Sequence, residues 1–454
     1  MKHKHPLTLA REARGWSARE FARRLCELGA QCGVPVGTRK DGVYRWERPD
    51  AATGRTRHPD LPTQRLIAEL LGIPQDMAEP QMWPRWLSLD PLQQPTRYTW
   101  DAAGATAALA EVSRGETVMD RRQFTQLTGT TLTTSLWMWL TADPVAAGQM
   151  TRGRRLGEAA VGHVEERVRQ LRHTDDLDGG GQLLTEAAAA LDFVVSLLKT
   201  RSYSDAHGAR LYAAAADFAR MHAWAQFDAH DQCADAVFHA ALRAAHASGS
   251  HVLGSHVLAF WSIAANNTGR PDAAEDMIAT ALSAARGRTT PRVEAMLHSR
   301  RARARARRGD LAALTDLGRA AELLHAAEHE TPKDPDPEWV YWFDPAELAG
   351  VTGSTHLDFG QPGRAEQAYV EAAALFPADR TRTRVLFLGR QAEAQWLQDD
   401  PERACATGHQ ALDLAQEISS HRAAGPLRDL ADQMGRSTTL PAVRDFRERV
   451  LTLS

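Results

Sequence analysis

The sequence predicts an all-α protein in which a small N-terminal helical domain precedes a long solenoid of stacked helical hairpins. Three observations predict it. Residues 7–71 fall into short amphipathic helices separated by Ser, Gly and Pro. A segment rich in Pro and Trp follows, in which no long helix can form. From residue 182 onward the chain is Ala-rich and repeats itself. These observations place the domains at residues 1–74, 75–118 and 119–454.

The first two N-terminal helices follow from their end signals. An apolar face over residues 7–13 stops before Gly15. Ser17 then stands where an N-cap belongs, and Glu20 three residues later completes a capping box. The second helix carries Phe21 and further apolar residues at helical spacing, so it is expected to pack against the first helix.

A third and a fourth helix complete the N-terminal domain. After a Gly-containing loop, Thr38 is a plausible cap for a helix in which Val43 and Trp46 face inward. The fourth helix, over residues 62–71, begins with a Pro in its first turn and closes the core. The remaining positions of the third helix are polar and are expected to point outward: Lys40, Asp41, Tyr44 and Arg45.

These residues resemble the Cro/C1-type (XRE) helix-turn-helix of bacterial repressors, in which a Ser or Thr opens the recognition helix and an apolar-x-x-Trp-Glu segment ends it. The likeness covers residues 5–73, although the second helix and its loop are longer here than in the compact pattern. It implies that double-stranded DNA is a partner. The implied base-facing residues are Lys40, Asp41, Tyr44 and Arg45, with Arg39 in the same interface. The implied phosphate-binding residues are Ser17, Arg19 and Thr38. The alternative is a small helical protein-docking module.

The distribution of charge agrees with DNA binding. Residues 1–72 contain 14 Lys and Arg against 8 Asp and Glu, a balance of +6, whereas the whole chain is at −3 and the remainder therefore at −9. A basic domain joined to an acidic one suits a protein that meets phosphates at one end only. The four cysteines show no CxxC spacing, so neither a zinc ribbon nor a disulfide framework is predicted, and we expect a cytoplasmic location.

One segment imitates an export signal. Residues 120–124 read Asp-Arg-Arg-Gln-Phe and precede a Thr-rich apolar stretch, as in a twin-arginine signal. The segment lies far from the N-terminus, so we interpret it as the first helix of the last domain, and no membrane association is expected. The segment resembles those that follow the same kind of N-terminal domain in actinobacterial regulators.

The connector is too apolar to be a free linker. It contains Trp83, Trp86 and Trp100 among several prolines. We therefore expect it to be docked on one or both neighbouring domains.

The repeats are defined by a small residue followed, seven positions later, by a second small residue. The anchors are Ala234, Ala274, Leu314, Ala365 and Ala404, and the second positions are Ala241, Ala281, Ala321, Ala372 and Ala411. Gly269, Gly309 and Gly360 are expected to mark the turns inside the hairpins. The pattern resembles tetratricopeptide repeats, with a longer period and most of the first-helix residues of that family missing.

Two features could form an effector site in the solenoid. An insertion at residues 329–345 holds four aromatic residues, which either line a pocket or fill the space under a long loop. Polar and aromatic residues on expected first helices could face a groove, and paired Asn side chains there could grip a peptide backbone. The candidate effector residues are Trp261, Asn266, Asn267, Arg300, Tyr341 and Trp342.

Catalytic motifs have little support. Residues 325–329 match the HxxEH pattern of zinc peptidases, but no third ligand accompanies them and a solvated helix end is the simpler reading. The histidines between residues 222 and 256 are irregularly spaced. No phosphate-binding loop or nucleophile elbow is present in the sequence. We expect no enzyme activity, no cofactor and no metal.

The sequence thus predicts a sequence-specific DNA-binding transcriptional regulator. We expect a homodimer on a two-fold operator, because a single small domain contacts too little DNA to select one site. The repeat domain would dimerise and sense a small-molecule or peptide effector. The alternative is a repeat-based protein-interaction scaffold that its N-terminal domain localises to DNA.

Overall fold

The computed structural model is all-α, as the sequence predicts. It describes residues 5–13, 16–47, 57–71, 73, 83–84, 87, 98–113, 129–141, 155–178, 180–230, 233–330, 334–376, 380–416, 421–435 and 440–453. Within these ranges all regular secondary structure is helical, and the only β feature is an isolated bridge between Arg155 and Ser202. No helix in the described ranges combines the length and the apolar character needed to cross a bilayer.

The chain divides into two compact units. The N-terminal unit comprises residues 1–99 with 127–135, and the C-terminal unit comprises residues 100–126 with 136–454. Much of the expected connector lies outside the described residues, as do Trp86 and the export-like segment 120–124. Among the connector's described residues, Trp83 and Leu87 are buried in the core of the N-terminal unit and Trp100 is buried in the C-terminal unit, whereas Thr99 is exposed.

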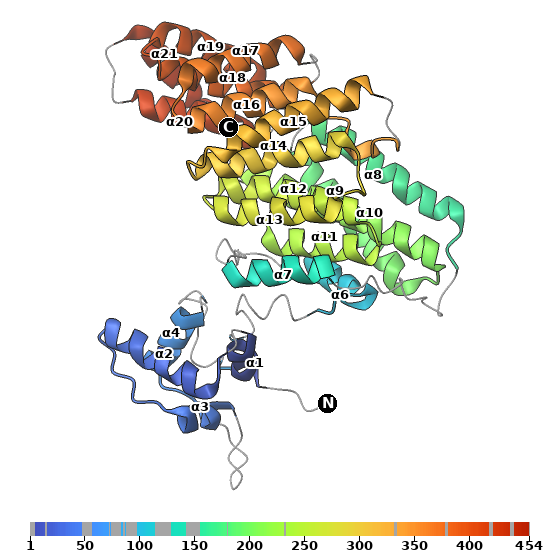
Figure 1. Ribbon diagram of the computed structural model, residues 1–454, viewed down its shortest axis with the longest axis vertical. Helices are drawn as coiled ribbons and strands as arrows, with labels where there is room; N and C mark the ends of the chain where they lie inside the picture. The colour runs from blue at the N-terminus through green and yellow to red at the C-terminus, as the bar shows by residue number, and fades with distance from the viewer. Residues whose placement is uncertain are drawn as a thin grey trace. The chain divides into compact units, whose positions relative to one another are not determined.

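In the described part of the N-terminal unit, four complete helices surround one apolar core (Figure 1). They are α1 (Pro6–Ala13), α2 (Ala18–Gln31), α3 (Lys40–Glu47) and α4 (Leu61–Leu71). The Ser17 hydroxyl caps α2 by accepting a hydrogen bond from the backbone N–H of Glu20 at 3.2 Å, which confirms that predicted helix start. Because the cap satisfies an otherwise orphaned N–H, it fixes where the chain turns into α2.

The C-terminal unit is a stack of antiparallel helices (Figure 1). It opens with α6 (Ala102–Ser113), the last residues of α7 (Gly129–Thr141), α8 (Glu158–Asp178) and α9 (Gly180–Thr200). The hairpins that follow are α10 (Asp205–His230) with α11 (Asp235–Ala247), α12 (His251–Asn267) with α13 (Pro271–Ala285), and α14 (Pro291–Arg307) with α15 (Ala312–His329). After the short η3 (Glu338–Val340) come α16 (Pro345–Asp358) with α17 (Pro362–Leu375), α18 (Thr381–Trp396) with α19 (Pro401–Ala415), and finally α20 (His421–Met434) and α21 (Pro441–Val450).

The turns inside four of the hairpins share one backbone geometry. Gly269, Gly309 and Gly360 have φ of 79°, 73° and 65°, as expected for turn residues, and Asp399 takes the same role with φ 60°. The residue after each of them donates its backbone N–H to the carbonyl five residues earlier, at 2.9–3.2 Å. This is the Schellman arrangement, which satisfies the last carbonyls of the first helix and reverses the chain in a fixed direction. Each first helix is thereby left on the same side of the stack.

The repeated alanines lie in the core, although one of the five repeats is shifted by one residue from the predicted register. In four of the five predicted repeats both members of the pair are at most 1% exposed: Ala234, Ala241, Ala274, Ala281, Ala365, Ala372, Ala404 and Ala411. The predicted pair Leu314 and Ala321 is wrong, because both side chains are exposed while Ala313 and Ala320 are fully buried. The anchor follows Gly309 by four residues rather than five, which rotates the buried face of α15 by one position.

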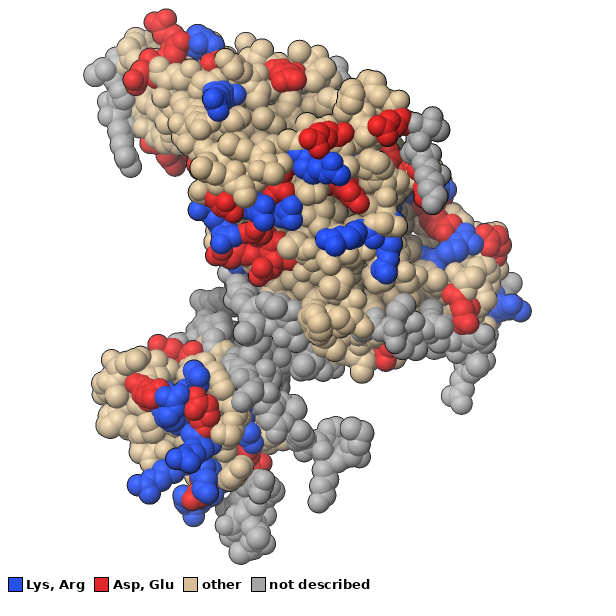
Figure 2. All heavy atoms as spheres, viewed as in Figure 1, with Lys and Arg blue, Asp and Glu red and all other residues tan. Residues whose placement is uncertain are grey.

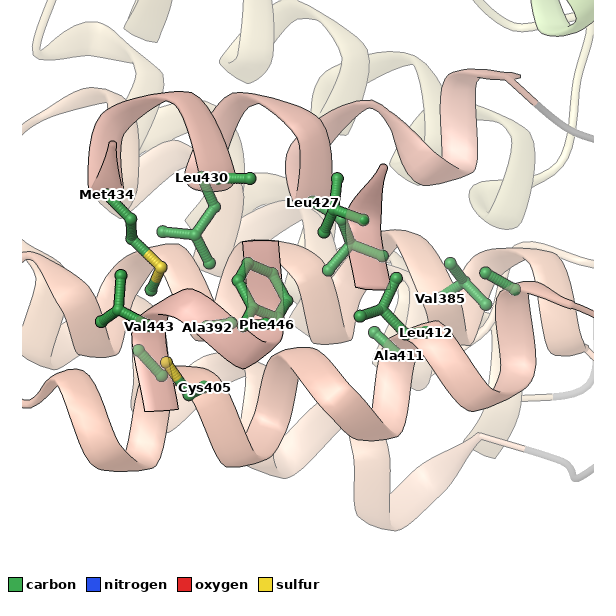
Figure 3. Close-up of a cluster of buried hydrophobic side chains, with 14 of the residues drawn as sticks. Val385, Ala392, Cys405, Ala411, Leu412, Leu427, Leu430, Met434, Val443 and Phe446 are labelled. Atoms are coloured by element: carbon green, nitrogen blue, oxygen red, sulfur yellow. The ribbon is translucent and has the colours of Figure 1, made fainter. Parts of the chain in front are cut away.

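The last repeat shows what the small residues achieve. Figure 3 shows Ala411 and Leu412 of α19 facing a core that includes Val385 of α18, Leu427 of α20 and Phe446 of α21. Phe446 is fully buried. Because Ala411 carries only a methyl group, neighbouring helices can approach closely enough for the larger side chains to fill the remaining space.

The stack curls, so that helices distant in sequence come into contact. Besides its neighbours along the chain, α18 contacts α8, and α20 contacts α10. The first helices of successive hairpins therefore surround a common interior.

Candidate functional site

Helix α3 is fixed to α1 by a buried ion pair. The Arg11 guanidinium on α1 donates from Nε to Glu47 Oε1 at 2.6 Å and from Nη2 to Glu47 Oε2 at 3.1 Å. Both residues are buried, and Val43, one turn before Glu47, is fully buried as predicted. Trp46 is half-buried against the same core. One face of α3 is thus held rigidly and the opposite face is left to solvent.

The long loop before α3 is held against α2. The Cys26 thiol donates to the carbonyl of Val36 at 3.0 Å and lies 3.5 Å from the carbonyl of Thr38. The Val34 N–H donates to the Gly29 carbonyl at 2.8 Å, and a Cβ on Gly29 would lie 2.6 Å from the Val34 carbonyl oxygen. The loop is longer than in the compact pattern, but these contacts attach it to α2 at fixed points.

The predicted DNA-facing residues lie on the solvent side of this unit. Five of them form one exposed group at the start and along the outer face of α3: Arg39, Lys40, Asp41, Tyr44 and Arg45. Ser17 and Arg19, at the start of α2, are also exposed, whereas Thr38 is half-buried. Figure 2 shows Lys and Arg side chains gathered over α2 and α3. The arrangement offers one rigid helix face with cationic and hydrogen-bonding groups.

The α3 helix begins two residues after Thr38. The Thr38 side-chain oxygen lies over Gly42, where a Cβ would collide with it. Within α3, Arg45 Nε donates to the Asp41 carbonyl at 3.1 Å. The exposed group therefore includes one side chain, that of Arg45, which is hydrogen-bonded to its own helix.

The C-terminal unit contains a pocket on the inner side of its curl. The pocket encloses a cavity of about 130 Å³ and opens to solvent at its mouth. Its walls come from first helices, namely α8, α10, α12, α14, α16, α18 and α20, together with the insertion before α16. Of the predicted effector residues, five line it: Asn266, Asn267, Arg300, Tyr341 and Trp342.

Trp261 lies outside the pocket. Its side chain is fully buried, its indole N–H donates to Asp235 Oδ1 at 2.5 Å, and its ring stacks on Phe238 at 5.9 Å between centroids. Asp235 also accepts two hydrogen bonds from the Arg270 guanidinium at 3.0 and 3.2 Å. Trp261 therefore belongs to the packing between α11 and α12.

The aromatic insertion both lines the pocket and fills space. Trp339 stacks face to face on His256, with centroids 4.0 Å apart and planes 6° apart. Trp342 lies edge-on to Phe260 at 5.9 Å. All of these rings line the pocket, whereas Phe343 is fully buried outside it. The two interpretations of the insertion are therefore each correct for part of it.

Arginines dominate the polar part of the wall, and sequence reasoning found only one of them. The lining arginines are Arg172, Arg220, Arg300, Arg303, Arg380, Arg382, Arg390 and Arg422. The wall carries only two carboxylates, Asp175 and Glu347. The available signal was the presence of arginines inside Ala-rich helices, but many such arginines are surface residues, and only the curl of the stack brings these eight together.

Ion pairs between the wall arginines and carboxylates join helices that are distant in sequence. Arg172 on α8 pairs with Asp217 on α10 at 2.6 Å, and Arg382 on α18 pairs with Asp175 on α8 at 2.7 Å. Burial lowers the pKa of the Arg303 guanidinium and that of Arg422 to about 10. Burial also places the pKa of His256 well below its usual value, so this imidazole is neutral near pH 7.

The HxxEH segment forms a helix end. His325 and His329 lie on the exposed end of α15, with their rings stacked at 4.1 Å. In the described part of the chain, no group of three or more potential ligands is arranged to hold a metal ion. Two histidines of the irregular group, His239 and His246, pack edge-on against Trp100.

Comparisons with known proteins add no identification. No protein-family model matches the chain, and no curated protein matches it either.

Proposed function

We propose that this protein is a sequence-specific DNA-binding transcriptional regulator whose C-terminal unit senses a small ligand in the cytoplasm. One observation carries the proposal: α3 is held from behind by Val43 and the Arg11–Glu47 ion pair while it presents a polar, cationic face to solvent. A helix that enters a DNA groove needs this combination of a rigid back and an exposed hydrogen-bonding front.

The polar face matches the two kinds of contact that DNA offers. Lys40 and Arg45 are exposed cations that can donate to guanine, while Asp41 can accept from cytosine. Ser17 and Arg19 lie at the start of α2, where backbone amides and a cation suit a phosphate. The resemblance to the Cro/C1-type repressors assigns the same roles to these positions.

The pocket supports ligand sensing over the scaffold alternative. Three aromatic residues of the insertion line a defined pocket, as expected for a small ligand, and the wall draws on helices from both ends of the stack. A ligand there would change the curl, and with it the way in which two copies present their N-terminal units. We propose that the regulator is a homodimer, because two half-sites are needed for selectivity.

The test is a selection of duplexes from a random pool by the full chain, followed by affinity measurements on the selected site. Lys40→Ala and Arg45→Ala should each weaken specific binding by about 1–3 kcal/mol and leave the fold intact. Arg319→Ala, which removes an exposed cation on α15, is the matched control and should have no effect. Failure to enrich any sequence, or unchanged affinity in both α3 variants, would remove the proposal.

A further inference from the structure

The pocket wall contains one arginine, Arg390, that forms no ion pair among the described residues. Arg390 on α18 donates to the Ser354 hydroxyl of α16 at 2.5 Å. In the part of the chain that the structure describes, no carboxylate lies within ion-pair distance of Arg390, whereas each of the seven other lining arginines has one. The Arg390 guanidinium can therefore offer its remaining N–H groups to a ligand.

Arg390 also stands next to like charges. Arg303 of α14 and Arg422 of α20 line the same pocket, and the charge of Arg390 adds to the main effect of burial in lowering the pKa of both. Three guanidiniums from three helices thus share one poorly solvated region. Asp358 and Asp228 compensate the charges of Arg303 and Arg422, whereas Arg390 forms no ion pair, so an oxyanion bound between the three guanidiniums would compensate the remaining positive charge.

Further donors around the pocket have no hydrogen-bond acceptor among the residues that the structure describes. The Nε atoms of Arg172 and Arg300, Nη1 of Arg220 and the indole N–H of Trp224 are buried without a hydrogen-bond partner among the described residues. All four residues line the pocket. Buried donors are usually satisfied, so a group of them around one pocket indicates a ligand that brings acceptor oxygens.

The pocket wall also contains aromatic side chains. Trp339, Trp342 and Phe260 supply aromatic surfaces, and the Arg300 guanidinium lies 5.2 Å from the Trp342 ring centroid. These side chains come from α12, α14 and the insertion, whereas the arginines next to Arg390 come from α14 and α20. Aromatic surfaces of this kind favour a ligand with a planar ring that packs against them.

We propose that this pocket binds a small organic acid in which a carboxylate or a phosphate, held by Arg390 with Arg303 and Arg422, is joined to a planar ring that packs on Trp339 and Trp342. The role of this acid as the effector rests on the function proposed above. Its binding to the pocket does not depend on that function.

The probes for the test are simple acids of this class. Isothermal titration calorimetry of the full chain would compare 1-naphthyl phosphate and 1-naphthaleneacetate with 1-naphthaleneacetamide, the neutral counterpart of the second acid. At least one acid should bind at about 1 mM or below and at least about tenfold more tightly than the amide, because the charged hydrogen bonds require the anion. The stronger of the two acids identifies the oxyanion that the site prefers.

Matched variants locate the binding. Arg390→Gln should weaken the preferred acid at least about tenfold and leave the amide unchanged, whereas Arg319→Gln on the exposed face of α15 should change neither. Trp342→Leu should weaken the acid and the amide together, and Trp137→Leu, at an indole that is 65% exposed, should not.

Three results would overturn the proposal: no heat with either acid, an amide that binds as tightly as the acid, or an Arg390→Gln variant within about twofold of the wild type. DNA binding of the same preparations, measured without probes, separates the two proposals. If the chain binds the acid but no duplex, the proposed acid site stands and the proposed regulator function is overturned. If it binds a duplex but no acid, the regulator function stands and the acid site is overturned.

Discussion

Arg11 and Glu47 form a two-point ion pair that joins the first and third helices of the N-terminal unit, with N–O distances of 2.6 and 3.1 Å. Their side chains are 10% and 2% exposed. The pair lies directly behind the polar face of α3. It therefore determines how that face is oriented as well as how stable the unit is.

Removal of one partner of this pair should be more damaging than removal of both. Arg11→Met leaves the Glu47 carboxylate buried without its cation, and should lower the free energy of unfolding of this unit by about 3–5 kcal/mol. The double variant Arg11→Met, Glu47→Leu should recover most of that loss. Calorimetric unfolding of the full chain measures both, and equal losses in the single and double variants would contradict the argument.

Gly408 on α19 is required by its contact with Phe446. A Cβ at residue 408 would lie 2.5 Å from the Phe446 ring, which is fully buried. Gly408→Ala should therefore destabilise the protein by about 1–3 kcal/mol through overpacking. Gly318→Ala is the control, since nothing lies within 4 Å of its Cβ position, and it should stabilise α15 by about 0.5–1 kcal/mol. Urea unfolding followed by circular dichroism compares them, and a neutral Gly408→Ala would show that the ring can move.

Asp316 on α15 should make stability depend on pH. Burial, the largest influence, would raise the pKa of this carboxyl, but hydrogen bonds from His298 and Arg301 outweigh it and hold the pKa below its usual value. A carboxyl whose pKa is lower in the folded state stabilises the fold above its unfolded pKa, and this contribution is lost as pH falls through the folded value. The wild type should therefore lose this contribution below about pH 4.

The variant Asp316→Asn isolates this contribution. At pH 7 it should be less stable than the wild type by about 1.5–3 kcal/mol, and the difference should shrink as the pH falls below 4. Asp272→Asn, at a side chain that is 81% exposed, should show little difference at either pH. Chemical unfolding at a series of pH values gives the comparison, and a constant difference between pH 7 and pH 3 would contradict the prediction.

The pocket arginines should differ in how much they contribute to stability. Arg303 is buried and pairs with Asp358 while it donates to the Ser354 carbonyl at 2.6 Å, so Arg303→Gln should cost about 3–5 kcal/mol of unfolding free energy. Arg390→Gln loses one hydrogen bond to Ser354 and relieves repulsion from its neighbours, so its stability should stay within about 1 kcal/mol of the wild type. Thermal unfolding in the absence of ligand tests this, and the reverse order of the two variants would contradict it.

Local signals predicted a large part of the fold. The Ser17 cap, the inward position of Val43 and the Gly turns depend on interactions within a few residues, and all three are as expected. The register of the α15 repeat could not be predicted, because one residue fewer separates Gly309 from its anchor and both Ala313 and Leu314 are compatible with the pattern.

The pocket was predicted less well, for two physical reasons. Trp261 and Asn266 lie on the same helix, which is buried on nearly all sides, so periodicity cannot distinguish a side that faces a pocket from one that faces the core. Arg390 and its neighbours come from helices that meet only through the curl of the stack. That curl depends on many small packing contacts, and no short motif encodes it.

The ion pair between Arg382 and Asp175 joins residues 207 positions apart. In most repeat arrays each repeat contacts only its immediate neighbours, so the array can unfold progressively from one end. Here the ion pair across the interior joins α8 to α18, so these two helices cannot separate without breaking it. The unit should therefore unfold in one cooperative step. A ligand bound in this interior would affect the whole array at once.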